Sequence, residues 1–462
     1  MLIRGAEAVM TGRAGPGARA GAVDIRIRDG VVTELGRLAP APGEELIDAS
    51  GCVVYPAWVN THHHLAQTLM KATPAGLNTA LREWLREVPS RYRRFMDERA
   101  FRIAARLGMI ELMLSGCATI ADHNYIYYPG MSFDSGAILF EEAERLGVRF
   151  VLCRGGMTRA QPGYERDTPA YLWPETTDAI VADVERLAGR FHDPSPRAHR
   201  RVVMAPTTPA HRVQPQDLVE MARAARRLGI RLHTHLSENM DYLTYFREHH
   251  GQSPVAFCAE HEWLGPDVWF AHLCHVTDEE IRMMAAVGTG IAHCPGSNCR
   301  LGSGIAPAPR MHAAGMPVSL AVDGAASNEP GDMLSEAHAA WYVHRAAKGA
   351  TGAADGGADA VTAEDVIHWG TAGGGRVLDL DVGVIAPGAA ADIAIYSLDD
   401  PRCYGVHDVA VAPVAVGAAG RLVRLLCGGR TLVEDGAIPG IDYAELRAQA
   451  RDAVRQLGQA HG

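Results

Sequence analysis

The sequence predicts an α/β fold in which a (β/α)8 TIM-type barrel is combined with a small β unit built from both chain ends. Between residues 56 and 378, helices of ten or more residues alternate with short β-branched runs, as in a parallel sheet. Seven or eight such units fit into this interval, so closure into a barrel is the natural arrangement. The flanking segments, 1–55 and 379–462, have the alternating pattern of strands instead.

The first segment, 1–55, contains VDIRIRDGVVTELG, in which apolar and polar residues alternate around Asp29-Gly30. An Asp-Gly pair between two alternating runs predicts a β-hairpin.

In the barrel interval, predicted helices precede predicted strands and close on a glycine, the residue that most readily adopts the left-handed conformation after a helix. The helix–strand pairs are 137–147 with 148–154, 215–229 with 230–236, and 278–288 with 289–293.

The last segment, 379–462, contains ADIAIYSL and RLVRLLCGGRTLVEDG, which read as strands separated by Gly-rich turns. We expect them to complete the β unit begun at the N-terminus. A final helix over 442–457 has one apolar stripe for docking, made by Leu446, Ala450, Val454 and Leu457.

Composition excludes several classes of partner. The 462 residues carry a formal charge of -10, which leaves no basic excess for nucleic acid or an anionic membrane. Nine scattered cysteines without a CxxC pair indicate reduced thiols. No uncharged apolar run reaches the ~18 residues of a membrane helix, and the first residues lack a signal-peptide core. We therefore expect a cytoplasmic protein.

Several common catalytic motifs are absent. Neither lysine precedes Ser or Thr, so there is no P-loop, and neither HExxH nor the HxE plus PCxxC zinc signature occurs. A turn at 288–290 lacks the third glycine of a dinucleotide-binding loop and follows a helix, which disfavours nicotinamide chemistry.

Histidines stand instead at the ends of predicted strands. In VVYPAWVNTHHHLAQ an apolar strand runs into three histidines, and the strand period of two projects His62 and His64 to the same side. Two imidazoles on one side make half a metal site, although a polar turn would give the same letters. Further candidates follow three other strands: His233, His235 and Glu238 in IRLHTHLSEN, His272 and His275 in VWFAHLCHVTD, and Asp323 in VSLAVDGAASN.

Each of these clusters is weak alone, but four strand ends deliver ligand-type residues in series. An acid after so apolar a run as the one before Asp323 is costly unless it meets a cation or hydrogen-bond donors. The carboxyl ends of barrel strands share one rim, where barrel enzymes have their sites. The pattern therefore predicts a metal site at this rim.

The order and flanks of these motifs resemble the amidohydrolase superfamily. The matching segments are VNTHHH, HTHLSE, AHLCHV, AHCPGSNCRLGSGIAP, VDGAASN and, near the C-terminus, GVIAPGAAADIAIY. They are similar to the branch that holds triazine hydrolases and the guanine, S-adenosylhomocysteine, 8-oxoguanine and isoxanthopterin deaminases. The resemblance covers nearly the whole chain and implies a distorted barrel with a small β-sandwich domain.

Carried over residue by residue, the resemblance implies one divalent metal ion held by His62, His64, His235 and Asp323. Three histidines and an aspartate suit zinc or iron, and we favour zinc. Such an ion lowers the pKa of water from about 15.7 to roughly 7, and Asp323 is placed to accept the water proton.

The resemblance also implies that Glu238 is the proton shuttle and that His272 orients the water or polarises the substrate carbonyl. A departing amine must be protonated, which needs an acid of tuned pKa. Some relatives carry a substrate-gripping histidine where this chain has Thr207 and Thr208. Whether His211 substitutes for it, and whether His293 lines the site, stays open.

Lysine scarcity bears on the number of metal ions. Two-metal members of the superfamily bridge their ions with a carbamylated lysine at the end of strand four, and here that segment reads VVMAPTTPAH. The two lysines, Lys71 and Lys348, lie elsewhere in the sequence. We expect a single metal ion, which disfavours ring opening of the dihydropyrimidinase and dihydroorotase type.

Within the branch, NTHHHLAQTL, SGCATIADHNYIYYPG and CRGGM resemble the isoxanthopterin and 8-oxoguanine deaminases. We expect a metal-dependent deaminase of a bicyclic amino-oxo heterocycle, with isoxanthopterin favoured. Alternatives are 8-oxoguanine or a guanine-like purine, and a hydroxyatrazine-type triazine amidohydrolase or chlorohydrolase. Chloride leaves without protonation, so Glu238 disfavours a pure dechlorinase. A non-catalytic barrel is disfavoured because all four ligand positions are filled.

Recognition of a flat lactam requires hydrogen-bond donors and an apolar wall. Gln67 and Arg154 are candidate donors, and Trp84 or a tyrosine of NYIYY is a candidate wall. Because relatives are commonly dimers or larger, we also expect a homo-oligomer.

Overall fold

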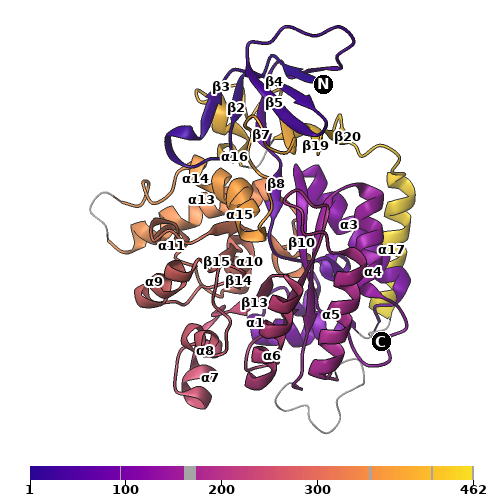
Figure 1. Cartoon of the computed structure of the whole chain (residues 1–462), viewed down its shortest axis with the longest axis vertical. Helices are drawn as coiled ribbons and strands as arrows, with labels where there is room; N and C mark the ends of the chain where they lie inside the picture. The colour runs from indigo at the N-terminus through magenta and orange to yellow at the C-terminus, as the bar shows by residue number, and fades with distance from the viewer. Residues whose placement is uncertain (94, 161–172, 353–355, 418–419, 460–462) are drawn as a thin grey trace.

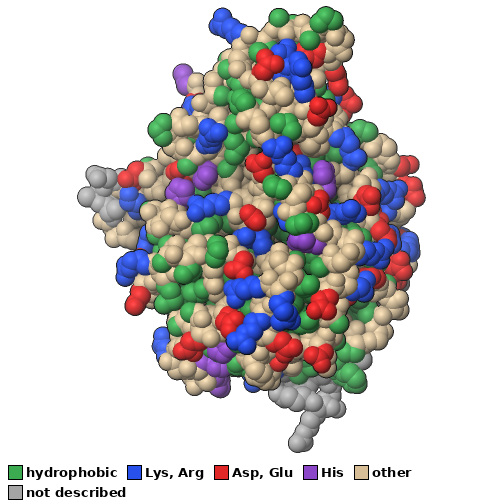
Figure 2. Space-filling view, viewed as in Figure 1, with side chains coloured by type: hydrophobic (Ala, Val, Ile, Leu, Met, Phe, Trp, Pro, Cys, Tyr) green, Lys and Arg blue, Asp and Glu red, His purple; other side chains and the backbone are tan. Residues whose placement is uncertain are grey.

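The structure is a computed structural model that describes residues 1–93, 95–160, 173–352, 356–417 and 420–459. Figure 1 shows a β-rich part that holds the N-terminus above a larger part in which helices surround strands. Acidic and basic side chains are interspersed on the face drawn in Figure 2. No helix in the described part of the chain combines the length and the apolar character that a bilayer crossing requires.

The larger part is built on eight parallel strands that lie side by side in the order of the sequence, which confirms the predicted barrel. These strands are β8 (Trp58–Asn60), β10 (Cys117–Asn124), β11 (Arg149–Gly156), β12 (Arg200–Pro206), β13 (Leu232–Leu236), β14 (Val268–His272), β15 (Gly290–His293) and β16 (Val318–Leu320). Nearly all of their residues are buried, as expected for a parallel sheet covered on both faces.

The two edges of this sheet meet through a short parallel pair, β9 (His63–His64) and β17 (Asp323–Gly324). Asp323 lies opposite His63 in this pair. One layer below, the Thr61 and Ser319 hydroxyls are 2.7 Å apart and hydrogen-bonded. The barrel is therefore nearly closed, and its seam brings the first histidine motif next to Asp323.

Helices cover the outside of the barrel (Figure 1). Gly147, Gly229 and Gly288 end three of them at φ values of 80°, 67° and 75°, as predicted. The helices between the barrel strands and after them include α3 (Glu98–Leu114), α4 (Ser135–Leu146), α5 (Thr177–Phe191), α6 (Pro215–Leu228), α7 (Met240–His250), α8 (Pro254–Glu260), α9 (Asp278–Val287), α10 (Pro295–Leu301), α11 (Ala308–Ala313) and α13 (Met333–Ala350). Short helices after the barrel strands are α12 (Ala325–Asn328), α14 (Ala363–His368), α15 (Gly374–Leu378) and α16 (Ala412–Ala415).

The β-rich part contains two sheets that share one apolar core. The first has the order β5 (Val31–Gly36), β4 (Asp24–Arg28), β1 (Leu2–Arg4), β6 (Leu46–Asp48). The second has the order β20 (Arg430–Glu434), β19 (Arg421–Cys427), β18 (Ile393–Ser397), β7 (Cys52–Pro56), β2 (Ala8–Met10), β3 (Arg19–Gly21).

The second sheet pairs β18 with β7, so strands from the two chain ends hydrogen-bond to each other. The predicted hairpin is β4–β5, and both of its turn residues have positive φ, 49° at Asp29 and 75° at Gly30. The exact boundaries of the two parts, after residues 55 and 378, stay predictions.

The last helix, α17 (Tyr443–Gln459), packs beside α3, and Arg99 donates to Asp452 at 2.8 Å across this contact (Figure 1). Its buried stripe is rotated from the predicted one. Leu446 and Leu457 are buried, but Val454 is 48% exposed and Ala453 takes its place in the contact. The prediction was wrong at Val454 because a period of four drifts off a helix face that repeats every 3.6 residues.

Candidate active site

A cavity of about 560 Å³ opens at the carboxyl ends of the barrel strands. Its position is the one that the strand-end motifs predicted. Seven of the predicted site residues line it, namely His64, Gln67, Trp84, His235, Glu238, His272 and Asp323. Among the predicted site residues, His62 and Arg154 are not part of this lining.

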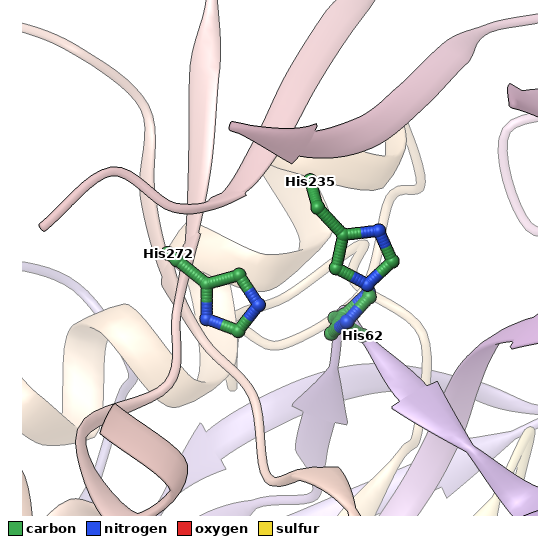
Figure 3. A group of neighbouring side chains, drawn as sticks. All are labelled: His62, His235 and His272. Atoms are coloured by element: carbon green, nitrogen blue, oxygen red, sulfur yellow. The ribbon is translucent and has the colours of Figure 1, made fainter. Parts of the chain in front are cut away.

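At the floor of the cavity, three histidines and one carboxylate converge. Asp323 Oδ1 lies 3.2 Å from His62 Nε2 and 3.3 Å from His64 Nε2. His64 Nε2 lies 3.2 Å from His235 Nε2. Figure 3 shows the rings of His62 and His235 pointing toward each other, with His272 approaching from a neighbouring element. The structure therefore brings together the four residues that the resemblance implied as metal ligands.

The orientation of the His62 ring is fixed by a relay that begins at a backbone carbonyl. His233 Nδ1 lies 3.0 Å from the Trp269 oxygen, which can only accept, so His233 donates from Nδ1. Its Nε2 then accepts from His62 Nδ1 at 2.7 Å. His62 Nε2 consequently keeps a lone pair, and it has no hydrogen-bond partner among the described residues.

The other two histidines are oriented in the same way. His64 Nδ1 donates to the backbone oxygen of His123 at 2.7 Å, and His235 Nδ1 donates to that of Thr207 at 2.7 Å. Both Nε2 atoms therefore point lone pairs at each other across 3.2 Å. Burial lowers the pKa of His62, His64 and His235, so the rings are neutral, as metal ligands must be.

This donor set fits a divalent metal ion. Ligand atoms at about 2.1 Å from a tetrahedral ion are separated by roughly 3.4 Å, close to the distances at the floor. Lone pairs facing each other at 3.2 Å repel unless a cation lies between them. Asp323 Oδ1 is also buried without a hydrogen-bond partner in the described chain, while its Oδ2 accepts from Ser297 Oγ at 2.5 Å and Ser327 Oγ at 2.9 Å. The donor set of the floor therefore suits a divalent metal ion, and the floor is called the metal-binding site below.

The backbone at this rim is held in an unusual conformation. His272 has φ 76°, Asp323 has φ 57° and Ser237 has φ 50°, all in the left-handed region that residues with a Cβ seldom adopt. Each such residue costs on the order of 1–3 kcal/mol and persists where surrounding structure enforces it, often at functional sites. His272 ends β14, Ser237 directly follows β13, and Asp323 begins β17. The strained backbone positions therefore lie at the rim where the side chains of the site converge.

Glu238 and His272 face each other above the metal-binding site. His272 Nε2 lies 3.7 Å from Glu238 Oε2, and His272 Nδ1 is 2.9 Å from Asn298 Oδ1. Ser303 Oγ donates to Glu238 Oε1 at 3.4 Å. Burial raises the pKa of Glu238, although His272 opposes this shift. A carboxyl group of raised pKa exchanges protons more readily near neutral pH, as a proton shuttle requires.

These features are accompanied by a match to a known family. The model of the amidohydrolase family matches residues 53–432. The chain belongs to the amidohydrolase family. This amidohydrolase is 56% identical to an isoxanthopterin deaminase from an unknown prokaryotic organism, over 99% of its own length and 97% of the relative's. It is 38% identical to the 8-oxoguanine deaminase of Pseudomonas aeruginosa, over 93% and 94%.

Among solved structures, the amidohydrolase is similar to the atrazine chlorohydrolase of Arthrobacter aurescens TC1 complexed with zinc. The TM-score is 0.90 at 28% identity, and the match covers 98% of this chain and 99% of the other.

Gln67 and Trp84 lie in the cavity wall, where the sequence analysis expected substrate contacts. Gln67 Nε2 donates to the Tyr125 hydroxyl at 3.2 Å, whereas Gln67 Oε1 is buried with no partner among the described residues. A Cβ at Gly324 would lie 1.9 Å from this oxygen, so a larger residue there would displace the Gln67 amide. Trp84 Nε1 donates to the Ala326 backbone oxygen at 3.1 Å, which anchors its ring in the wall of the amidohydrolase cavity.

Arg154 is turned away from the cavity. Its guanidinium donates to Glu175 at 2.7 Å and 2.9 Å, to Asp183 at 2.9 Å and to the Gly155 oxygen at 2.7 Å. It also stacks 3.9 Å from the centre of the Tyr127 ring. The guanidinium N–H groups of Arg154, which the sequence analysis expected to bind substrate, therefore bind these protein groups instead.

The questions left open by the sequence have structural answers. His211 lines the cavity together with Thr207 and Thr208. His293 does not, because it is buried against His344 with their Nε2 atoms 2.9 Å apart. Lys71 pairs with Glu111 and Lys348 with Asp359, away from the cavity lining.

Two residues of the amidohydrolase site were missed by the sequence analysis. His123, at the end of β10, is buried beneath the metal-binding site, with its ring 4.7 Å from that of His235. It ends an apolar strand in CATIADHN, the same signal that identified the other strand ends. Arg93 lines the cavity from the segment between β9 and α3, and no motif singled it out.

Proposed function

We propose that this amidohydrolase is a hydrolytic deaminase of a flat bicyclic heterocycle with an amino-pyrimidinone edge, and that isoxanthopterin is its substrate. The observation that carries the proposal is the complete set of Glu238, His272 and four metal ligands around one cavity, in a chain 56% identical to an isoxanthopterin deaminase. The lower identity of 38% to an 8-oxoguanine deaminase makes the oxidised purine the second candidate.

The proposal includes a single divalent ion, zinc, held by His62, His64, His235 and Asp323. The donor chemistry supports it, as does zinc in the similar atrazine chlorohydrolase. When bound, such an ion supplies a water molecule of lowered pKa and so a nucleophile at neutral pH. The absence of a lysine from β12 and the residues after it supports one ion rather than a bridged pair.

The chain's own carboxylates handle the protons. Asp323 accepts a proton from the water through Oδ1, because its Oδ2 is already held by Ser297 and Ser327. Glu238 donates its proton to the ring nitrogen beside the attacked carbon. It then takes the hydroxyl proton of the resulting adduct and passes it to the departing amino group, which leaves as ammonia. The proton held by Asp323 returns to Glu238 at the end of the cycle, so both protons derive from the water. His272, oriented by Asn298, holds the water or the substrate oxygen from the opposite side.

The substrate edge is recognised by Gln67. Its unpartnered Oε1 accepts from a lactam N–H, and its Nε2 is held in place by Tyr125. A buried acceptor without a partner costs about 1–3 kcal/mol, which a substrate N–H recovers on binding. Trp84 contributes a flat wall for the rings. Assembly into a homo-oligomer stays a prediction.

The test is release of ammonia by purified enzyme of known metal content from isoxanthopterin, pterin, 8-oxoguanine, guanine and hydroxyatrazine. We expect the highest kcat/KM on isoxanthopterin and about one metal ion per chain. Faster turnover of 8-oxoguanine would move the assignment to the purine. Ammonia from none of the five, with metal bound, would overturn the proposed substrate class.

A further inference from the structure

Arg93 is a buried cation in the wall of the cavity. It ends the short helix α2 (Arg91–Arg93), which follows α1 (Leu81–Leu85) in the segment that connects β9 with α3. Its side chain lines the same cavity as Glu238 and the metal ligands, and the residue is only 6% exposed. Arg93 therefore lies in the same cavity as the motif residues, although it belongs to none of the motifs.

Among the described residues, the guanidinium of Arg93 has fewer partners than a buried charge normally has, and one of them is the Tyr128 ring, whose centre lies 5.5 Å away. Among the described residues its one hydrogen bond runs from Nη2 to the backbone oxygen of Tyr127, and its Nε has no partner. It forms no ion pair with any carboxylate in the described part of the chain, whereas the neighbouring Arg154 has two. Burial lowers the pKa of Arg93 to about 10, so it remains cationic at neutral pH. A desolvated cation that has no carboxylate partner in the described part of the chain is costly unless a ligand compensates it.

Tyr125 connects Arg93 with the metal-binding site. Its ring packs 5.1 Å from the ring of His64, and its hydroxyl accepts from Gln67. Arg93 contacts the same segment of the wall, because its Nη2 donates to the Tyr127 backbone oxygen and its guanidinium lies 5.5 Å from the centre of the Tyr128 ring. A planar substrate whose amino-bearing ring lies over the metal-binding site and beside Gln67 therefore extends its second ring toward the Arg93 side of the wall.

We propose that Arg93 binds the oxo group on the second ring of the substrate and so selects heterocycles that carry one. This inference rests on the proposed function and deepens it. Isoxanthopterin and 8-oxoguanine have a second-ring oxo group, whereas pterin and guanine have the same amino-pyrimidinone ring without it. The adjacent lactam N–H makes that oxygen electron-rich, and a guanidinium presents parallel N–H donors to such an acceptor.

The test compares Arg93→Met with wild type on the pair isoxanthopterin and pterin. We expect the ratio of kcat/KM for isoxanthopterin to that for pterin to fall by about 10-fold to 100-fold, since a hydrogen bond to a charged group is worth about 1.5–3 kcal/mol. The loss should appear mainly in KM. Arg93→Lys, which keeps the charge but not the fork, should recover part of the ratio.

Arg82→Met is the matched control, because Arg82 is an exposed arginine at the edge of the same cavity. It removes the same charge and should change the ratio less than about threefold, if direct contact rather than a diffuse field is responsible. Binding is measured separately by calorimetry of isoxanthopterin with Glu238→Gln and with Glu238→Gln/Arg93→Met. The dissociation constant should rise with the second substitution.

The outcomes separate this inference from the proposed function. Rapid wild-type turnover of isoxanthopterin with an unchanged ratio in Arg93→Met overturns the role of Arg93 and leaves the deaminase assignment standing. An equal loss on both substrates, with the calorimetric affinity unchanged, also overturns it. Absence of wild-type turnover on both members of the pair overturns the proposed function and this inference together.

Discussion

The floor and the wall of the cavity differ in how completely the protein satisfies their polar groups. On the floor, His62, His64 and His235 each have the outward ring nitrogen fixed by a hydrogen bond, so that only the inward nitrogens remain for an ion. On the wall, Arg93 Nε and Gln67 Oε1 are buried without a hydrogen-bond partner in the part of the chain that the structure describes. The floor is thus completed by a metal ion and the wall by a substrate, and the two can be tested separately.

The largest expected effect comes from breaking the floor. Asp323→Asn keeps the size of the side chain but removes the negative charge that faces three neutral histidines. We expect bound metal to fall well below one ion per chain and kcat to fall roughly 1000-fold or more. Elemental analysis and ammonia release on the same sample give both values. Full metal and full activity in this variant would refute the ligand assignment.

Glu238→Gln tests the group between floor and wall. Because Glu238 is not among the four proposed ligands, the metal content should stay at the wild-type level while kcat falls by roughly 100-fold to 10,000-fold. Loss of metal together with activity would instead make Glu238 part of the metal-binding site. The substrate dissociation constant, measured by calorimetry, should change little compared with kcat.

Arg93 lies in the wall and Arg154 outside the cavity lining, yet both contact Tyr127, which makes them a natural comparison. Arg154→Met would leave Glu175 without its cation, whereas Asp183 keeps its pair with Arg186, and we expect the free energy of unfolding to fall by about 3 kcal/mol. Arg93→Met leaves no carboxylate behind and should stay within about 1 kcal/mol of wild type. Urea unfolding of the metal-loaded variants measures both. If both variants lose the same free energy of unfolding, the two arginines contribute equally to stability and the contrast between them is wrong.

The sequence predicted the floor better than the wall for a physical reason. Ligands such as His235 and Asp323 sit at strand ends, and parallel strands bring their carboxyl ends to one rim whatever the connecting segments do. Arg154 also lies near the end of a strand, but ion pairs with Asp183 on α5 and with Glu175, just before that helix, draw its side chain away. Arg93 lies in a connection without periodic pattern, so its burial depends on tertiary packing that no local signal encodes.

A smaller effect is expected one layer beneath the floor. His233→Ala removes the acceptor that fixes His62 Nδ1, so the His62 ring loses its preferred tautomer and orientation. Such outer partners typically contribute 10-fold to 100-fold in metal affinity. Competition with a chelator measures the change, and His233→Gln, whose amide oxygen can accept the same hydrogen bond, should recover part of it. Unchanged affinity in His233→Ala would show that packing alone holds His62.

A pH-dependent effect on stability, rather than on activity, is expected at Asp122, on the strand that carries His123. Burial raises the pKa of Asp122 to about 7 from 3.8, while the Leu65 backbone N–H donates to it at 2.6 Å just after His64. The native state therefore holds this proton more tightly than the unfolded state does. Stability falls as pH rises from about 4 to about 7 and levels off above, by at most about 4 kcal/mol.

Asp122→Asn keeps an acceptor for Leu65 but cannot ionise, so it removes this component of the pH dependence. The difference in stability between the variant and wild type should favour the variant more at pH 8 than at pH 5. Thermal unfolding of both proteins at the two pH values, with metal bound, measures this difference. Parallel curves for the two proteins would show that Asp122 is ionised in the native state across this range. In that case the Leu65 backbone N–H, directly after His64, donates to an ionised carboxylate and not to a neutral acid. The first turn after β9 would then be held by a charge-assisted hydrogen bond.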